Sequence, residues 1–161
     1  TEAVDGVVLG GFANAQTPLS ALSVLVEGLY VQRGGNVRTD PDGETITGGV
    51  RSDYLTFTLH ARLAAGLGRA RIHVSGGMTI DQLLRSRIDP SLRSVLDNES
   101  PTVFGVSAAA GIGARVTERV HVELEARIVE GLGDAHSGSF VSFRNRSKEI
   151  LVRVGVPLPG R

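Results

Sequence analysis

The sequence predicts an all-β fold, an up-and-down antiparallel transmembrane β-barrel of the eight-stranded type, with short turns at one end and long loops at the other. Two observations lead to this prediction. Apolar and polar residues alternate along seven segments, and short and long connections alternate between those segments. With 161 residues, the whole chain, 1–161, is expected to be a single β-barrel domain.

The alternation has a period of two residues. In "DYLTFTLHARLAAGL", which spans 53–67, Leu55, Phe57 and Leu59 fall on one face, while His60 and Arg62 fall on the other. A helix would scatter the charged residues of "VHVELEARIV" around its circumference, whereas a strand collects them on one face. The seven predicted strands are approximately 6–15, 19–33, 50–67, 70–80, 103–116, 120–132 and 148–156.

The connections follow a regular rhythm. Three are short, "QTP", "GR" and "TER", and they alternate with three long ones at 34–49, 81–102 and 133–147. Outer-membrane barrels have this asymmetry, with short turns on one side of the membrane and longer loops on the other. We expect solvent-exposed loops, with a hairpin tip at "DPDGE" and a short helical excursion after Asp81. Its apolar residues recur at roughly helical spacing: Leu83, Leu84, Ile88, Leu92, Val95 and Leu96.

The predicted strands have one uncharged, mostly aliphatic face and one polar, ionisable face. The ionisable face collects Glu27, His60, Arg62, Arg71, His73, His121, Glu123, Glu125, Arg127, Glu149 and Arg153. In a soluble barrel the aliphatic face would point inward, as in a lipocalin-like carrier with an apolar ligand. In a transmembrane barrel the aliphatic face meets lipid and the charges meet inside.

The composition of the charged face favours the transmembrane alternative. Its signs are mixed and it has no lysine. The planar fork of arginine suits carboxylates in a confined lumen better than a lysine ammonium does. An eight-stranded barrel is just wide enough for side chains to fill. We therefore expect these residues to form a lumen charge network that holds the barrel shut, with no conducting pore.

Several functional classes lack support in the sequence. Seventeen basic and seventeen acidic residues give no electrostatic footprint for nucleic acid. The absence of cysteine excludes thiol nucleophiles, cysteine zinc sites and disulfides. His60, His73 and His121, with Glu123 and Glu125, raise the possibility of zinc, but a hydrogen-bonded network explains them better. We expect no catalysis, no cofactor and no metal.

Short motifs carry a family resemblance. The runs "LSVLVEGLYVQRGG", "DYLTFTLHARLAAGL", "ARIHVSGGMTIDQLL", "FGVSAAAGIGARV" and "VHVELEARIVEGLGD" resemble the small porin-like outer-membrane β-barrel domain family of Gram-negative bacteria. The resemblance implies location in the cell outer membrane, with lipid as a partner. The matching positions are Glu27, Tyr30, Gly34, Asp53, Tyr54, Leu55, Gly76, Gly77, Gly111, Gly113, Glu125, Ala126, Arg127, Gly131 and Leu132.

The strand count departs from the family pattern, which implies eight strands where the sequence offers seven. Three alternatives remain open: the chain is truncated before Thr1, a partner protein or second copy supplies a strand, or the count is wrong by one. The expected role is structural, or one of interaction through the long loops or self-association. A soluble lipocalin-like carrier is the alternative.

Overall fold

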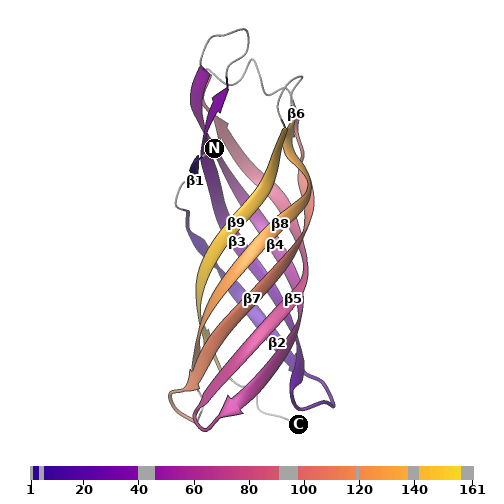
Figure 1. The fold of residues 1–161 in the computed structure, drawn as a ribbon, viewed down its shortest axis with the longest axis vertical. Coiled ribbons are helices and arrows are strands. Elements are labelled where there is room, and N and C mark those ends of the chain that lie inside the picture. The colour runs from indigo at the N-terminus through magenta and orange to yellow at the C-terminus, as the bar shows by residue number, and fades with distance from the viewer. Residues whose placement is uncertain are drawn as a thin grey trace.

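A single antiparallel sheet contains every strand of the chain in the computed structural model, which describes residues 2–3, 6–39, 46–90, 98–118, 120–137 and 142–156 (Figure 1). No α-helix occurs in these residues. Seven long strands form the sheet: β2 (Val8–Gln16), β3 (Leu22–Thr39), β4 (Ile46–Leu67), β5 (Ala70–Ile88), β7 (Thr102–Arg115), β8 (His121–Ser137) and β9 (Ser142–Gly155). Two-residue strands extend it, β1 (Glu2–Ala3) beside β3 and β6 (Asn98–Glu99) beside β8.

The long strands pair in chain order, each antiparallel to the next, and the sheet curls into an incomplete barrel (Figure 1). The strands β2 and β9 are its two ends, and in the described residues no backbone ladder joins them. The predicted up-and-down fold and the seven long strands are confirmed. The short "GR" turn between β4 and β5 is also present, with Gly68 at a φ of +66° that other residues adopt rarely. Within the described ranges, no helix is long and apolar enough to cross a membrane.

The strands are longer than predicted at the end of the barrel where the long connections lie. The strands β3 and β4 stay paired up to Thr39 opposite Ile46, so most of the predicted loop 34–49 is strand. Likewise, β8 and β9 pair up to Ser137 opposite Ser142, within the predicted loop 133–147. These hairpins continue because two antiparallel chains satisfy one another's backbone groups even where the alternation of side chains weakens.

A short helix was predicted after Asp81. This prediction is wrong for the residues up to Ile88, because they belong to β5. The register of β4 and β5 shifts at Asp53 and Tyr54: Tyr54 lies opposite Leu83, and Asp53 lies opposite Arg85. The extra residue, Leu84, forms a bulge that reverses the alternation. When a bulge exchanges the inward and outward positions partway along a strand, the apolar residues on either side of it are spaced much as they are in a helix. Leu92, Val95 and Leu96 lie outside the described residues, as does the "DPDGE" tip.

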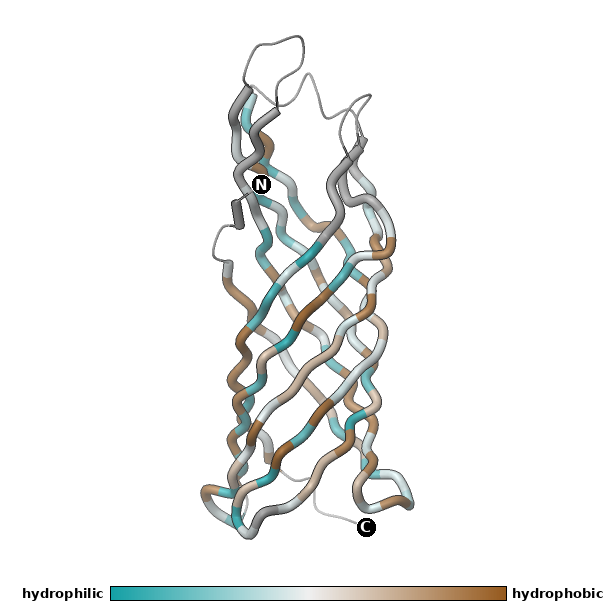
Figure 2. The backbone as a smooth tube through the Cα atoms, in the orientation of Figure 1, coloured by the Kyte–Doolittle hydropathy of each residue, from teal (hydrophilic) through white to brown (hydrophobic). Residues whose placement is uncertain are grey.

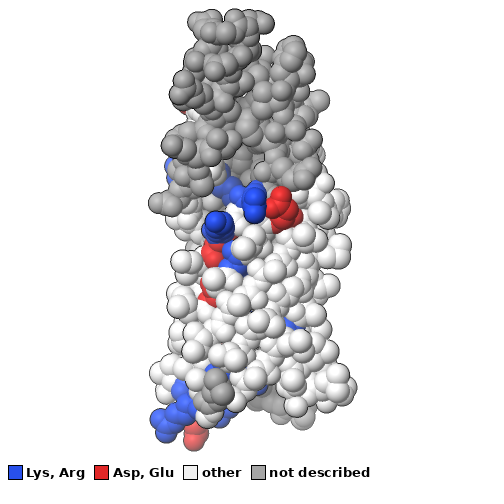
Figure 3. Space-filling model, in the orientation of Figure 1, with Lys and Arg blue, Asp and Glu red and all other residues white. Residues whose placement is uncertain are grey.

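The outer wall of the barrel is aliphatic. Leu59, Val74 and Leu124 are 54%, 55% and 50% exposed, and hydropathy alternates along the strands in Figure 2. The outward set includes Leu9, Val24, Val26, Phe57, Leu63, Ile72, Met78, Ile80, Phe104, Val106, Ile112, Ile128, Ile150, Val152 and Val154. On the face in Figure 3, charged side chains gather at the lower end and in the upper half of the described wall, down to about mid-height, and other residues cover most of the rest.

The height of this aliphatic belt matches a bilayer. On β4 it runs from Leu55 to Leu63, and a membrane-spanning strand needs about 9–11 residues. Asp53 borders it towards the long connections, and Arg69 borders it at the short turns. Burying such a wall in hydrocarbon requires that backbone groups pair within the sheet, which antiparallel ladders achieve.

A charge placed at mid-height on this wall tests its contact with lipid. Leu59→Arg is expected to lower the free energy of unfolding in bilayers by about 2–4 kcal/mol, whereas Gln82→Arg near the polar rim should change it by about 0–1 kcal/mol. Urea titrations of refolded protein in vesicles measure both. Equal effects at the two positions would contradict a membrane-facing belt.

Candidate functional site in the barrel lumen

Alternate residues of the strands point into the lumen and bury an unusual number of charged groups. Seven of them form what we term the central cluster, drawn from five strands. Its members are Glu27 on β3, Arg62 on β4, His73 on β5, Glu123, Glu125 and Arg127 on β8, and Arg153 on β9, all at most 6% exposed.

Glu125 is the centre of this cluster. Its Oε2 lies 3.0 Å from His73 Nε2 and 3.4 Å from Arg62 Nη2. Its Oε1 accepts hydrogen bonds from Arg127 Nη2 at 3.0 Å and from Arg153 Nη2 at 2.8 Å. Glu125 as a whole is 1% exposed. One carboxylate therefore connects β4, β5, β8 and β9 through the interior.

Arg62 holds a second carboxylate in a two-point contact. Its Nη1 and Nη2 donate to the two oxygens of Glu123 at 3.0 and 2.8 Å. Such fork-to-fork pairs fix orientation as well as charge. The contact spans the lumen from β4 to β8, strands that are not neighbours in the sheet.

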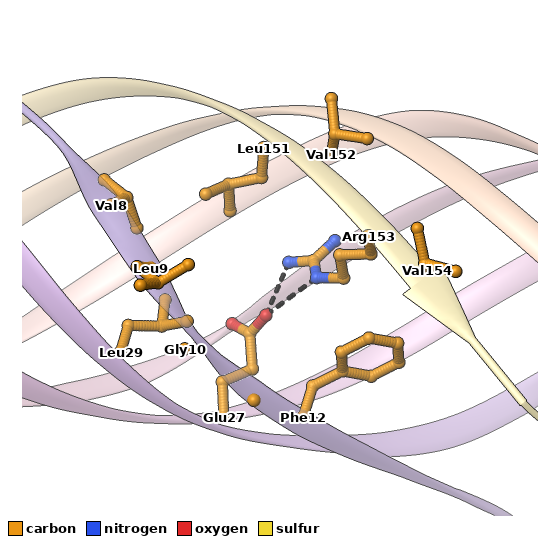
Figure 4. Close-up of a pocket in the computed structure, with 11 residues that line it drawn as sticks. Val8, Leu9, Gly10, Phe12, Glu27, Leu29, Leu151, Val152, Arg153 and Val154 are labelled. Carbon is orange, nitrogen blue, oxygen red and sulfur yellow. Dashed lines mark hydrogen bonds and ion pairs between the residues drawn. The ribbon is translucent and has the colours of Figure 1, made fainter.

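Glu27 lies on β3, the strand beside β2, and contacts β9 at the other end of the sheet. Its Oε1 accepts hydrogen bonds from Arg153 Nε at 2.8 Å and Nη2 at 2.6 Å, and its Oε2 accepts one from Arg127. Figure 4 shows Arg153 reaching from β9 towards Glu27, with Phe12 of β2 beside it. The Arg153 guanidinium lies 5.9 Å from the Phe12 ring centre, within the range of a cation–π contact.

The central cluster balances its formal charge. The carboxylates of Glu27, Glu123 and Glu125 face the guanidiniums of Arg62, Arg127 and Arg153, three against three, and His73 adds a further hydrogen-bonding group. Removing each charge from water is expensive, so a buried set persists only when every member has close partners of opposite sign. Removing one member leaves the others uncompensated.

Inward-facing glycines make room for these large side chains. A Cβ on Gly111 of β7 would lie 2.5 Å from His73 Cε1, and a Cβ on Gly113 would lie 3.0 Å from Glu123 Cγ. A Cβ on Gly77 of β5 would similarly lie 2.7 Å from a carbon of the His60 ring. The glycines in these strands therefore complement the lumen groups of the strands beside them.

A second cluster of charged residues lies closer to the long connections. Of its charged members, the sequence analysis predicted only Glu149. Arg33 pairs with Asp81 and, at 3.4 Å, with Glu149, and its guanidinium lies 5.5 Å from the Tyr54 ring centre. Asp81 Oδ1 also accepts a hydrogen bond from Thr56 Oγ1 at 2.6 Å. Arg33 is the last residue of the predicted strand 19–33, and Asp81 directly follows the predicted strand 70–80. Continuing the odd-numbered inward positions of their strands would have found both.

The structure buries most of the eleven residues predicted for the lumen. His60 is fully buried, with its ring nitrogens on Ser107 Oγ and, at 3.2 Å, on Ser75 Oγ. Arg71 is exposed and His121 is half-buried, and both lie at the short-turn end, apart from the clusters. The remaining members belong to the central cluster, or, for Glu149, to the second cluster.

Apolar side chains also point inward, at positions with the same parity as the charged ones. Tyr54 is 1% exposed inside the lumen. Phe12 also faces inward, opposite Glu27. The buried aliphatic residues of the described part are Leu25, Leu29, Val31, Val103, Ala109, Val129 and Leu151.

The lumen groups contact one another across the strands. Among the described residues, no three His, Asp or Glu side chains are arranged to hold a metal ion. The His60–Ser107 pair is buried. An opening of about 280 Å³ lies between β2 and β9.

Comparison with known protein families agrees with this geometry. The model of the outer membrane protein β-barrel domain family matches residues 6–137. These residues include all the long strands except β9. No curated protein matches the chain.

Removing the central carboxylate should destabilise the barrel strongly. We expect Glu125→Ala to lower the free energy of unfolding by about 3–5 kcal/mol, because it leaves buried guanidiniums unpaired. Glu130→Ala is the matched control: Glu130 belongs to the same strand, and its 3.2 Å pair with Arg146 is largely exposed. Its loss should cost about 0–1 kcal/mol. Similar losses in denaturant titrations would contradict the assigned role of Glu125.

A methyl group on Gly111 tests the fit of the glycines to the clusters. Gly111→Ala should cost about 1–3 kcal/mol, because the new Cβ overlaps the His73 ring. Gly66→Ala, where a Cβ meets nothing within 4 Å, should be neutral or stabilise by about 0.5 kcal/mol. Thermal unfolding in detergent compares them, and an unchanged melting temperature for Gly111→Ala would show that His73 moves freely.

Proposed function

Because the chain belongs to the outer membrane protein β-barrel domain family and lies in the outer membrane, we propose that its barrel is a non-conducting, non-enzymatic scaffold. In this proposal the charged clusters close the lumen and hold the wall together. The protein would act through the hairpins that it extends away from the membrane, or through association with itself or a partner.

The observation that carries the proposal is the ion-paired filling of the lumen. The Arg62–Glu123 and Arg153–Glu27 contacts both join strands that are not neighbours in the sheet. Side chains that cross the interior occupy the space that an ion or solute would need. A barrel of about eight strands has no width to spare beyond such side chains.

The length of the strands supports a presenting role. The strand β4 has 22 residues, and about 9–11 are enough to cross the bilayer. The hairpin of β3 and β4 therefore carries its paired backbone well past the aliphatic belt. A rigid ribbon of this kind exposes side chains to other macromolecules without a loss of loop entropy.

The lipocalin-like alternative is not supported. A soluble carrier needs its aliphatic face inside, but Leu59, Val74 and Leu124 lie outside, while Glu125 and Arg62 are buried. Catalysis is not proposed either. Members of this family are typically not enzymes, and the His60–Ser107 pair is buried.

Conductance measurements test the closed lumen. In planar bilayers the protein should give no steady ion current. The charge-balanced double variant Glu27→Ser/Arg127→Ser removes one carboxylate and one guanidinium from the interior, and a measurable current should then appear.

The matched control is Glu130→Ser/Arg146→Ser, which removes an exposed pair and should leave the bilayer silent. Circular dichroism establishes that each variant keeps its β-structure. A wild-type current that is insensitive to both double variants would refute the closed-lumen proposal.

A further inference from the structure

Three arginines lie together on the outer wall of the barrel, just beyond the aliphatic belt at the end with the long connections. Arg51 belongs to β4, Arg85 and Arg87 belong to β5, and all three are exposed. Together with Asp53 and Gln32, they form what we term the basic patch. None of its members belongs to the lumen clusters, so the closed-lumen proposal gives the patch no role.

The register of β4 and β5 brings these charges onto one face. Arg51 lies directly opposite Arg87, and Asp53 lies directly opposite Arg85. Ser52, which separates the two pairs on β4, is buried, so the pairs share the outer face. Directly opposed residues of antiparallel strands have Cβ atoms about 4.5–5.5 Å apart, and diagonal neighbours are about 7–8 Å apart. One compact ligand can therefore contact several of these side chains at once.

The charge of the basic patch is not balanced within the described part of the chain. Three guanidiniums stand beside one carboxylate, which leaves a formal charge of +2. Among the described residues, no ion pair joins any of these four groups to another. Like charges directly opposed across two strands are destabilising. The Arg51–Arg87 pair therefore costs free energy unless an anion binds between the two guanidiniums.

A small polar depression marks a place for that anion. It is lined by Gln32, Arg51, Asp53 and Arg87 and has a volume of about 50 Å³. One water needs about 10–15 Å³ of such space, so the depression accommodates a group with a few oxygen atoms, such as one phosphate. Gln32 lies opposite Asp53, and its Nε2 donates a hydrogen bond to Tyr30 Oη at 3.1 Å.

The basic patch lies at the height of the lipid headgroups. Tyr30 is half-buried on the outer wall opposite Leu55, where the aliphatic belt ends on β4. Tyrosine favours the membrane interface, because its ring is apolar and its hydroxyl is polar. Asp53 and Arg51 lie two and four residues beyond Leu55, or roughly 5–10 Å higher at the strand tilt of such barrels. Headgroups occupy about 5–8 Å on each side of the hydrocarbon core.

We propose that the basic patch binds a lipid of the outer leaflet whose headgroup carries a phosphate monoester. The long loops of outer-membrane barrels face the cell exterior, which assigns the patch to that leaflet. A phosphate monoester carries about −1.5 to −2 charges at neutral pH, so one such group matches the charge of +2. The guanidiniums of Arg51 and Arg87 donate paired hydrogen bonds to its oxygens.

A lipid has an advantage over soluble phosphate at this position. Its acyl chains lie against the aliphatic belt directly below the patch, beside Leu55, while its phosphate occupies the depression. Contact with the belt adds apolar burial to the charged contact. The proposal goes beyond the closed lumen and does not depend on it.

Lipid selectivity beside the patch tests the proposal. The chain has no tryptophan, so Tyr30→Trp places one fluorescent reporter next to the patch, and Ile150→Trp places a reference reporter on the belt of β9. Each variant is refolded in phosphatidylcholine vesicles that contain brominated phosphatidic acid or brominated phosphatidylcholine, and bromine quenches the tryptophan that it contacts. Phosphatidic acid should quench several-fold more strongly than phosphatidylcholine at position 30, and the two lipids should quench equally at position 150.

Two double variants separate the site from general attraction. Arg51→Gln/Arg87→Gln should lower the selectivity at position 30 by about fivefold for each arginine removed. Arg146→Gln/Lys148→Gln removes two exposed cations from the outer wall of β9 and should leave this selectivity unchanged. In pure phosphatidylcholine the first double variant should melt no lower than the wild type, because it loses the like-charge pair. That melting temperature also shows that the variant folds.

Any of three results would overturn the proposal. Equal selectivity at positions 30 and 150, or equal effects of the two double variants, would indicate diffuse attraction of anions to the barrel. Equal quenching by brominated phosphatidylglycerol, a phosphate diester with a single charge, would contradict the assignment of a monoester. Loss of the selectivity on addition of inorganic phosphate would assign the patch to a soluble anion. None of these results bears on bilayer conductance, so the two proposals can fail separately.

Discussion

The contacts of Glu125 and Glu27 with the lumen arginines are the interaction on which the rest of the barrel depends. A curled sheet that buries its charged face removes those charges from water, and only pairing inside the lumen offsets that desolvation. Glu125 connects β4, β5, β8 and β9, and Glu27 connects β3 to β9 through Arg153. The curvature of the sheet brings the partners together, and their pairing in turn holds the curvature.

This arrangement reverses the usual roles of core and surface. The aliphatic side chains that would form the core of a soluble protein lie outside, where lipid replaces protein packing. Polar and charged groups joined by directional hydrogen bonds therefore occupy much of the interior, beside a smaller set of buried apolar side chains. The low aromatic content, 4%, suits an interior of this kind, although Tyr54 and Phe12 contribute cation–π contacts to arginines within it.

Glycine has a matching role on the inner wall. Gly111 and Gly113 on β7 leave space for His73 and Glu123, which belong to the strands on either side. The lumen is thus divided between strands that supply large charged groups and a strand that supplies almost none.

Much of the fold followed from alternation alone. The seven long strands, their order and the burial of Arg62 and Glu125 are consequences of a period of two residues and of alternating connection lengths. Alternation failed where a bulge changed parity, as at Leu84, and where a paired ribbon continued with weaker alternation, as beyond Arg33. Arg33 and Asp81 obey the alternation, and their contribution to the lumen was missed because the predicted strands ended at Arg33 and just before Asp81.

The sequence by itself determined which side chains share a face, because strand geometry is local and repeats every two residues. Only the tertiary structure decided which of the lumen charges meet. Glu27 and Arg153 are 126 positions apart, and their contact depends on how far the sheet curls and how its strands are staggered. Curling also left Arg71 exposed at the short-turn end and set β2 opposite β9 with a gap between them. How the sheet curls depends on all the strands together, so no local segment determines these features.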